Sequence, residues 1–124
     1  MHADITLILS KASPATQALF YRAQELVEAV MPYTVKLIWP KQYIISYGVG
    51  PKKMSEHFCY INVLPSRINL GFYYGSMLSD PKHLLEGTGK LLRHVKIIDL
   101  KQLEDQALCH LIQEASTYLP KLQR

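Results

Sequence analysis

Residues 67 to 98 read RINLGFYYGSMLSDPKHLLEGTGKLLRHVKII, a segment with two predicted strands joined by a turn-rich connection. From Ile68 to Tyr74 every second residue is apolar, which is the period of a strand with one buried face. The alternation returns from His94 to Ile97. We therefore expect the second strand to re-enter the sheet to which the first belongs.

The connection between these strands carries most of the turn chemistry of the chain. Asp80 is suited to be the N-cap of a short helix, and Pro81 to be its first residue, because an N–H at that position has no partner within the helix. Gly87 is placed to end that helix in the left-handed conformation, and Gly89 follows two residues later. These four residues are predicted to shape a helix-to-strand loop.

The glycines of this connection do not form a phosphate loop of the nucleotide-binding type. Such a loop requires a glycine where this chain has Leu84, and a serine or threonine where it has Leu91. It also follows a strand and opens a helix, which is the reverse of the order expected here. A weaker anion site stays open, formed by successive backbone N–H groups beside Lys90 and Arg93.

The chain before this segment adds helices and strands. A short helix is expected within residues 1–12, and a longer one begins at Pro14 with Ser13 as its N-cap and ends before Pro32. Alternating apolar residues predict three further strands, over residues 33–39, 43–49 and 57–64.

A final amphipathic helix is predicted between Asp99 and Pro120, with Gln102 completing a capping box at its start. Short connections between successive strands require antiparallel neighbours. A helix, then strands, then a helix is the pattern of an α+β domain. The sequence thus predicts one domain, residues 1–124, in which about five antiparallel strands hold the two long helices on one face.

Composition limits the classes of function. With 124 residues and 48% hydrophobic side chains, the chain can bury a core and is not a disordered protein. Its apolar runs are too short to span a membrane and its first residues lack the pattern of a signal peptide, so we expect a cytoplasmic protein. Cys59 and Cys109 are expected to be free thiols. A net charge of +4 with scattered lysines does not indicate nucleic-acid binding.

The residue spacings do not match a catalytic or metal centre, so we expect neither an enzyme nor a resident cofactor. Cys59 and His57, two residues apart, are predicted to share one strand face, but no third group is placed to orient such a dyad. His110 precedes Glu114 by about one helical turn, which is typical of a surface contact.

The face of the sheet left uncovered by the helices is the predicted binding surface. It should carry Lys36, Ser46, Tyr60, Asn62, Arg67, Asn69, Tyr73, His94 and Lys96. We expect a small ligand to contact Trp39, Asn69, Tyr73, Lys90 and Arg93. An arginine can hold a carboxylate or phosphate with two parallel hydrogen bonds, whereas a lysine contributes a point charge.

Several short motifs resemble a known family. They are Trp39-Pro40, Asn69-Leu70-Gly71-Phe72, Gly75, Asp80-Pro81, Leu84-Leu85, Gly87-Thr88-Gly89-Lys90 and Arg93-His94-Val95-Lys96-Ile97. Over roughly residues 14–119 the chain is similar to the YdhG-like domain family, small bacterial proteins mostly of unknown function. The resemblance implies an α+β fold with an antiparallel sheet packed on helices. Some members are described as frataxin-like intracellular iron chaperones.

These observations lead to one main hypothesis of function, a non-enzymatic cytoplasmic binding module for a small anionic ligand or a partner protein. The resemblance implies an alternative, an iron-binding chaperone. Hard iron ions prefer clustered carboxylates, and Asp4, Glu25 and Glu28 are the nearest approach to such a cluster.

A third hypothesis places single-stranded nucleic acid on Tyr60, Tyr73 and Arg67, since such binding uses aromatic platforms with basic flanks. We rank it below the other two. No membrane partner is expected, and a homodimer stays open.

Overall fold

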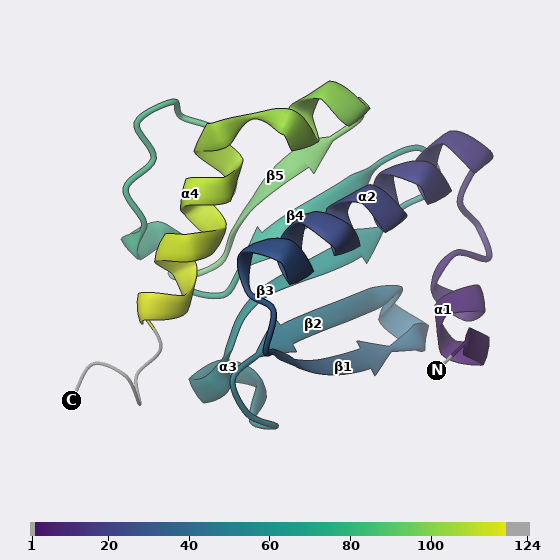
Figure 1. Cartoon of the computed structure of the whole chain (residues 1–124), viewed down its shortest axis with the longest axis horizontal. Helices are drawn as coiled ribbons and strands as arrows, with labels where there is room; N and C mark the ends of the chain where they lie inside the picture. Colours follow the sequence, from purple (N-terminus) through teal and green to yellow (C-terminus); the bar gives the residue numbers. More distant parts are fainter. Residues whose placement is uncertain (1, 119–124) are drawn as a thin grey trace.

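The computed structural model describes residues 2 to 118, which form an α+β domain around one sheet (Figure 1). The sheet has five strands, each antiparallel to its neighbours, in the same order as in the sequence. The strands are β1 (Val35–Trp39), β2 (Ile44–Gly48), β3 (His57–Val63), β4 (Ile68–Phe72) and β5 (Arg93–Ile97). The predicted α+β class and the five-stranded antiparallel sheet are therefore confirmed.

The helices are α1 (His2–Ile8), α2 (Pro14–Val30), α3 (Lys53–Glu56) and α4 (Gln106–Ala115). Helix α1 is the short helix expected near the start of the chain. Helix α2 begins as predicted, because the Ser13 hydroxyl accepts a hydrogen bond of 3.2 Å from the backbone N–H of Thr16. Pro14 is the first residue of that helix.

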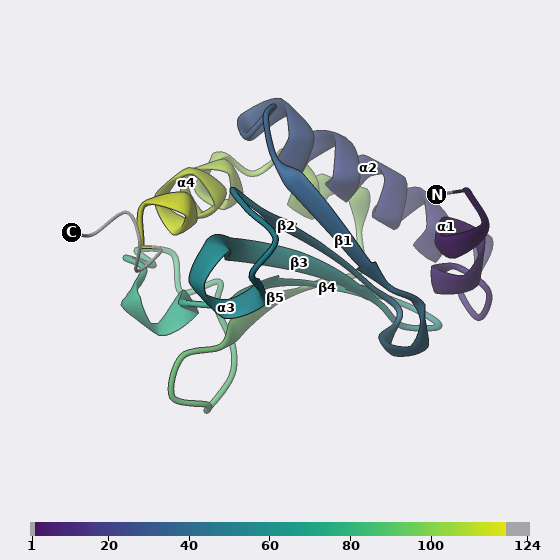
Figure 2. The same cartoon turned by 90° about the horizontal axis from the view of Figure 1, so that it is seen from below.

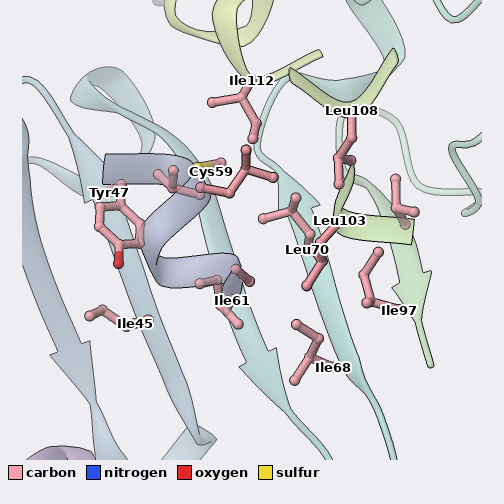
Figure 3. Packing of buried hydrophobic residues seen from close by; sticks show 14 of the residues in the cluster. Ile45, Tyr47, Cys59, Ile61, Ile68, Leu70, Ile97, Leu103, Leu108 and Ile112 are labelled. Atoms are coloured by element: carbon pink, nitrogen blue, oxygen red, sulfur yellow. The ribbon is translucent and has the colours of Figure 1, made fainter. Parts of the chain in front are cut away.

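Helices α2 and α4 lie on one side of the sheet, whereas α3 and the loop just before β5 project on the other (Figure 2). The earlier part of the connection between β4 and β5 lies beside α4, where the Ser79 hydroxyl donates to the Glu114 carboxylate at 2.8 Å. The core fills the space between the sheet and the helices α2 and α4. Figure 3 shows side chains from the strands meeting those that follow β5. The labelled residues are Ile45, Tyr47, Cys59, Ile61, Ile68, Leu70, Ile97, Leu103, Leu108 and Ile112. We call the opposite side of the sheet the open face.

The short helix predicted after Asp80 does not form. The Asp80 carboxylate accepts hydrogen bonds of 2.9 Å from the backbone N–H groups of both Leu84 and Leu85, and so closes an irregular loop. His83, inside this loop, has a φ of 53°, which a continuing right-handed helix does not allow. The carboxylate therefore satisfies backbone donors as expected, but in a turn rather than at a helix start.

The other residues predicted to shape this connection also lie in a loop. Pro81 and Gly89 are exposed, and Gly87 has a φ of 129°. Gly87 thus has the positive φ that was predicted for it, although no helix precedes it. A side chain at Gly87 would be strained at this φ.

The final helix is broken into two pieces. A 3₁₀-helix covers Leu100–Glu104, and α4 follows it. Asp99 and Gln102 form the predicted capping box, but at the start of the 3₁₀-helix. Asp105 then caps α4, since its carboxylate accepts a hydrogen bond of 2.9 Å from the backbone N–H two residues on. Pro120, the predicted end of the helix, lies outside the described residues.

A bulge in β3 separates two residues that were predicted to share a face. Tyr47 pairs with Cys59, but the next residue, Gly48, pairs with His57, so β3 contains one extra residue. Cys59 consequently packs in the core beneath the helices, whereas His57 contacts Ser46 on the open face. The prediction that Cys59 and His57 share one strand face is therefore wrong.

Lys36 was predicted on the open face but lies on the helix side of β1. It pairs in register with Tyr47, a core residue, and its ammonium group lies 3.3 Å from the Glu28 carboxylate of α2. The Tyr47 hydroxyl donates to the same carboxylate at 3.2 Å. The strand was predicted with the wrong phase because β1 is half-buried on both faces, which weakens the apolar signal.

Candidate functional site: the open face of the sheet

One row of residues crosses all five strands on the open face. In register, Trp39 aligns with Ile44, Ile44 with Asn62, Asn62 with Asn69, and Asn69 with Lys96. We call these five residues the cross-strand row. They alternate along their strands with residues of the core, so their side chains belong to the opposite side of the sheet. The row changes from apolar to amide to cationic.

A groove of about 500 Å³ lies at the apolar end of the row. It is lined by Leu37, Trp39, Gln42, Ile44 and Pro51. Pro51 belongs to the loop after β2, so this loop forms one wall and the first two strands form the floor. Trp39, predicted to contact a ligand, therefore lies at a concave surface. The sequence analysis did not identify Gln42 and Pro51, because both lie outside the predicted strands.

Hydrogen-bond donors gather at the polar end of the row. Arg67 Nε donates to Asn69 Oδ1 at 3.3 Å, which leaves the amide NH₂ group of Asn69 and the terminal nitrogens of Arg67 as donors. Lys96 lies next to Asn69 in register, and its ammonium group is 3.5 Å from Glu86. Both members of that ion pair are about half exposed, at 45% and 51%, so solvent screens the pair.

The middle of the open face is covered by aromatic rings. A Cβ atom at Gly71 would come within 2.0 Å of the Tyr60 ring, so that ring lies directly over the glycine. Tyr73 packs beside it, with 5.1 Å between the ring centroids. Tyr73 is 3% exposed, however, whereas Tyr60 is only half-buried. The stacking role predicted for Tyr73 therefore fits Tyr60 better.

Beneath these rings Ser46 joins two buried side chains. Its hydroxyl lies 2.8 Å from the Tyr73 hydroxyl and 2.7 Å from Nδ1 of His57. Burial lowers the pKa of His57, while the backbone of Gly50 and the charge of Glu56 act in the opposite direction. Ser46 and His57 are fully buried. A substrate cannot reach this serine–histidine contact, so it supports the structure of the face rather than a reaction.

Of the two predicted cationic contacts, Lys90 lies in the loop before β5 and Arg93 is the first residue of that strand. Arg93 Nη1 donates to the carbonyl of Gly89, and also to that of Leu92 at 2.7 Å. Its guanidinium group thus holds the loop that precedes β5. Lys90 is exposed in that loop. Arg93 is also aligned with Phe72, a core residue, so its strand position does not belong to the cross-strand row.

Metal ligation has little support in residues 2 to 118, where no three His, Cys, Asp or Glu side chains gather closely enough to hold an ion. Glu28, weighed as part of an iron site, instead accepts from Lys36 and Tyr47. Burial raises the pKa of the Cys59 thiol, which keeps it protonated and unsuited to ligation.

Comparison with known proteins found no matching family model, no matching curated protein and no matching solved structure. The YdhG-like resemblance therefore stays a prediction. Among the described helices none is both long enough and apolar enough to cross a bilayer.

Proposed function

We propose that this protein is a non-enzymatic binding module for a small anionic ligand that also carries an apolar part. The observation that supports this proposal is the cross-strand row, whose composition changes from Trp39 and Ile44 to two asparagines and then Lys96. Neighbouring strands lie about 4.8 Å apart, so the row extends roughly 19 Å. A ligand that lies along the row would contact apolar surface at one end and hydrogen-bond donors at the other.

The two ends of the proposed site have complementary roles. The groove beside Trp39 would take the apolar part of the ligand, because burial of apolar surface is favourable without fixed geometry. The donors of Arg67 and Asn69 would take the anionic group, since hydrogen bonds to a charged acceptor are stronger than neutral ones. Asn62 and Tyr60 lie between the two ends and would fix the orientation of the ligand.

We also infer that the arrangement of α2 and α4 over one face follows the YdhG-like, frataxin-like pattern implied by the motifs. The observed layout of Figure 2 is compatible with it. Iron delivery is the weaker function, because Glu28 is engaged with Lys36 and Tyr47. Nucleic-acid binding is weaker still, since Tyr73, one of its two predicted stacking platforms, is buried.

The single tryptophan of the chain makes the proposal directly testable. Trp39 fluorescence should be followed while the protein is titrated with a straight-chain carboxylate and with an aryl carboxylate. Each titration is repeated with the uncharged amide of the same acid. We expect saturable quenching by the acids and at least tenfold weaker binding of the amides, because tenfold corresponds to about 1.4 kcal/mol of lost charge-assisted hydrogen bonding.

Substitutions test which residues bind the anionic group of the ligand. Arg67→Gln and Asn69→Ala should each weaken binding of the acids and leave binding of the amides almost unchanged. Lys101→Gln, an exposed lysine of the 3₁₀-helix on the other side of the sheet, is the matched control and should have no effect. A Lys90→Gln variant tests whether the loop before β5 also borders the ligand. Equal affinity of the wild-type protein for acids and amides would refute the proposal, and tight ferrous or ferric iron binding would favour the chaperone.

A further inference from the structure

The two edge strands of the sheet differ in whether other parts of the chain hydrogen-bond to their outward backbone groups. In an antiparallel sheet each edge strand presents backbone N–H and C=O groups that point away from the sheet, and these groups pair readily with another strand. The edges here are β1 and β5. Which residues point outward follows from the register and from the backbone hydrogen bonds that flank the strands.

The outward groups of β5 are occupied by the chain itself. Glu86 N–H donates to the His94 carbonyl at 2.7 Å, and His94 N–H donates to the Glu86 carbonyl at 2.9 Å. The Gln102 side chain donates to the Lys96 carbonyl at 2.9 Å and accepts from the N–H of Ile98 at 2.7 Å. The segment before β5 and the 3₁₀-helix after it therefore close this edge.

The outward groups of β1 belong to Lys36 and Ile38. Val63 N–H donates to the Tyr43 carbonyl, so alternate residues of β2 from Tyr43 onward bond to β3. Ser46 and the other residues between them bond to β1, where their partners are Val35, Leu37 and Trp39. The backbone groups of Lys36 and Ile38 then point outward, and within residues 2 to 118 nothing hydrogen-bonds to them.

One usual protection of an open edge is missing at β1, although α1 lies beside part of this strand. A lysine on an edge strand commonly discourages pairing by keeping its charge in water. Here the Lys36 side chain is turned toward α2, and its charge is paired with Glu28 at 3.3 Å. The side chains on the other face of the strand are apolar, and Val35 is 38% exposed.

We propose that β1 pairs with β1 of a second copy of this chain, antiparallel and with Leu37 on the two-fold axis. In this register Leu37 lies opposite its own counterpart as a non-hydrogen-bonded pair. Lys36 of one copy lies opposite Ile38 of the other as a hydrogen-bonded pair. The outward backbone groups of both copies are then satisfied reciprocally. The apolar strip is self-complementary, because Val35 of each copy meets Trp39 of the other.

Charge substitutions at the axis test the proposal, because residue 37 meets only itself. Sedimentation velocity over a dilution series should show the wild-type chain as a reversible dimer. Leu37→Asp alone and Leu37→Lys alone should each be monomeric, since like charges would face one another. An equimolar mixture of the two variants should dimerise again. Ile98→Asp, at the closed edge and 71% exposed in the wild type, is the control and should dimerise normally.

A cross-link gives a second readout that does not depend on charge. In a Cys109→Ser background, where Cys59 is buried, Leu37→Cys should form an interchain disulfide under mild oxidation. Cα atoms in a non-hydrogen-bonded pair lie about 4.5 Å apart, which a disulfide can span. Val35→Cys is the matched control and should not cross-link, because the two substituted positions would be about 14 Å apart. A wild-type chain that stays monomeric at every concentration would overturn the proposal, as would a dimer unaffected by Leu37→Asp.

Discussion

Ser46 Oγ lies 2.7 Å from Nδ1 of His57, inside the protein and on the side of the sheet away from the long helices. His57 is fully buried, and Trp39 and Tyr73 flank its ring with centroids 6.5 Å away. A charge on this imidazole would therefore lose its solvation among aromatic rings, and the Gly50 backbone and the Glu56 charge offset this loss only in part.

We expect this histidine to make the protein less stable in mild acid. Because burial lowers the pKa of His57 in the folded state, the unfolded chain binds a proton first as the pH falls below about 6.5. The free energy of unfolding should then decrease, with a slope of at most about 1.4 kcal/mol per pH unit for this one proton. Urea unfolding at several pH values measures the slope, and His57→Gln should remove it. A slope that persists in His57→Gln would assign the effect to another group.

The Glu28 carboxylate should matter more for stability than the lysine that it pairs with. Glu28→Ala leaves the hydroxyl of buried Tyr47 without this acceptor, which costs about 1–3 kcal/mol. Lys36→Met removes a partly exposed ion pair worth about 1 kcal/mol or less. Chemical denaturation of both variants and of Tyr47→Phe gives the comparison. Glu28→Ala should lose most of its cost in the Tyr47→Phe background, and an unchanged cost would contradict this account.

Arg93 should control the mobility of the loop before β5 rather than the global stability. Arg93→Lys removes the hydrogen bonds from Nη1 to two backbone carbonyls of the loop, at a net cost of about 1 kcal/mol. Hydrogen exchange of residues 87–92 should become faster while exchange in the core strands stays the same. Lys90→Gln, in the same loop, is the control. Faster exchange throughout the sheet would instead make Arg93 a residue of the core.

Asp105 should contribute as much to the free energy of unfolding as Asp99, because each caps one of the two helices that follow β5. Each carboxylate accepts a hydrogen bond of 2.9 Å from a backbone N–H of the helix that it precedes. Replacement of either by alanine should cost about 1 kcal/mol of unfolding free energy, and Asp105→Asn should cost much less. The exposed neighbour Glu104, replaced by alanine, serves as the control in the same denaturation series. No loss in Asp105→Ala would mean that α4 is fixed by its apolar contacts alone.

The five strands could be predicted because alternation persists in segments that are buried on one side. In β4, for example, Ile68, Leu70 and Phe72 face the core and are fully buried. The start of α2 was also predictable, because Ser13 and Pro14 satisfy the first turn by local chemistry alone.

The errors share a physical cause, which is that one local pattern was compatible with two arrangements. Asp80 followed by proline suits a helix start, but the same carboxylate can also close a loop, and the tertiary structure selected the loop. The bulge at Gly48 has no clear signal in the sequence, so His57 and Cys59 were placed on one face. Asp105 did give a signal, an N-cap residue before Ala107 and Leu108, but the continuous apolar period concealed it.

The candidate site was only partly predictable for a related reason. Asn69 lies in the cross-strand row as expected, since the apolar residues of β4 fix the phase of that strand. Trp39 also lies in the row, but the phase of β1 was predicted incorrectly, so its face could not be assigned from the sequence. The depth at which Tyr73 lies could not be read from the sequence, because its burial depends on the rings that cover it. The direction of the Arg93 side chain depends on a loop whose shape was predicted incorrectly.

The backbone bridge between Glu86 and His94 limits how many copies of this protein can join through their sheets. A chain with two open edges could add copies at both ends and grow into a filament. This chain has one edge that the bridge and Gln102 have closed, so its valence for strand pairing is one. Assembly through β1 would therefore terminate at two copies, and we expect high concentration to increase the dimer fraction without producing fibres.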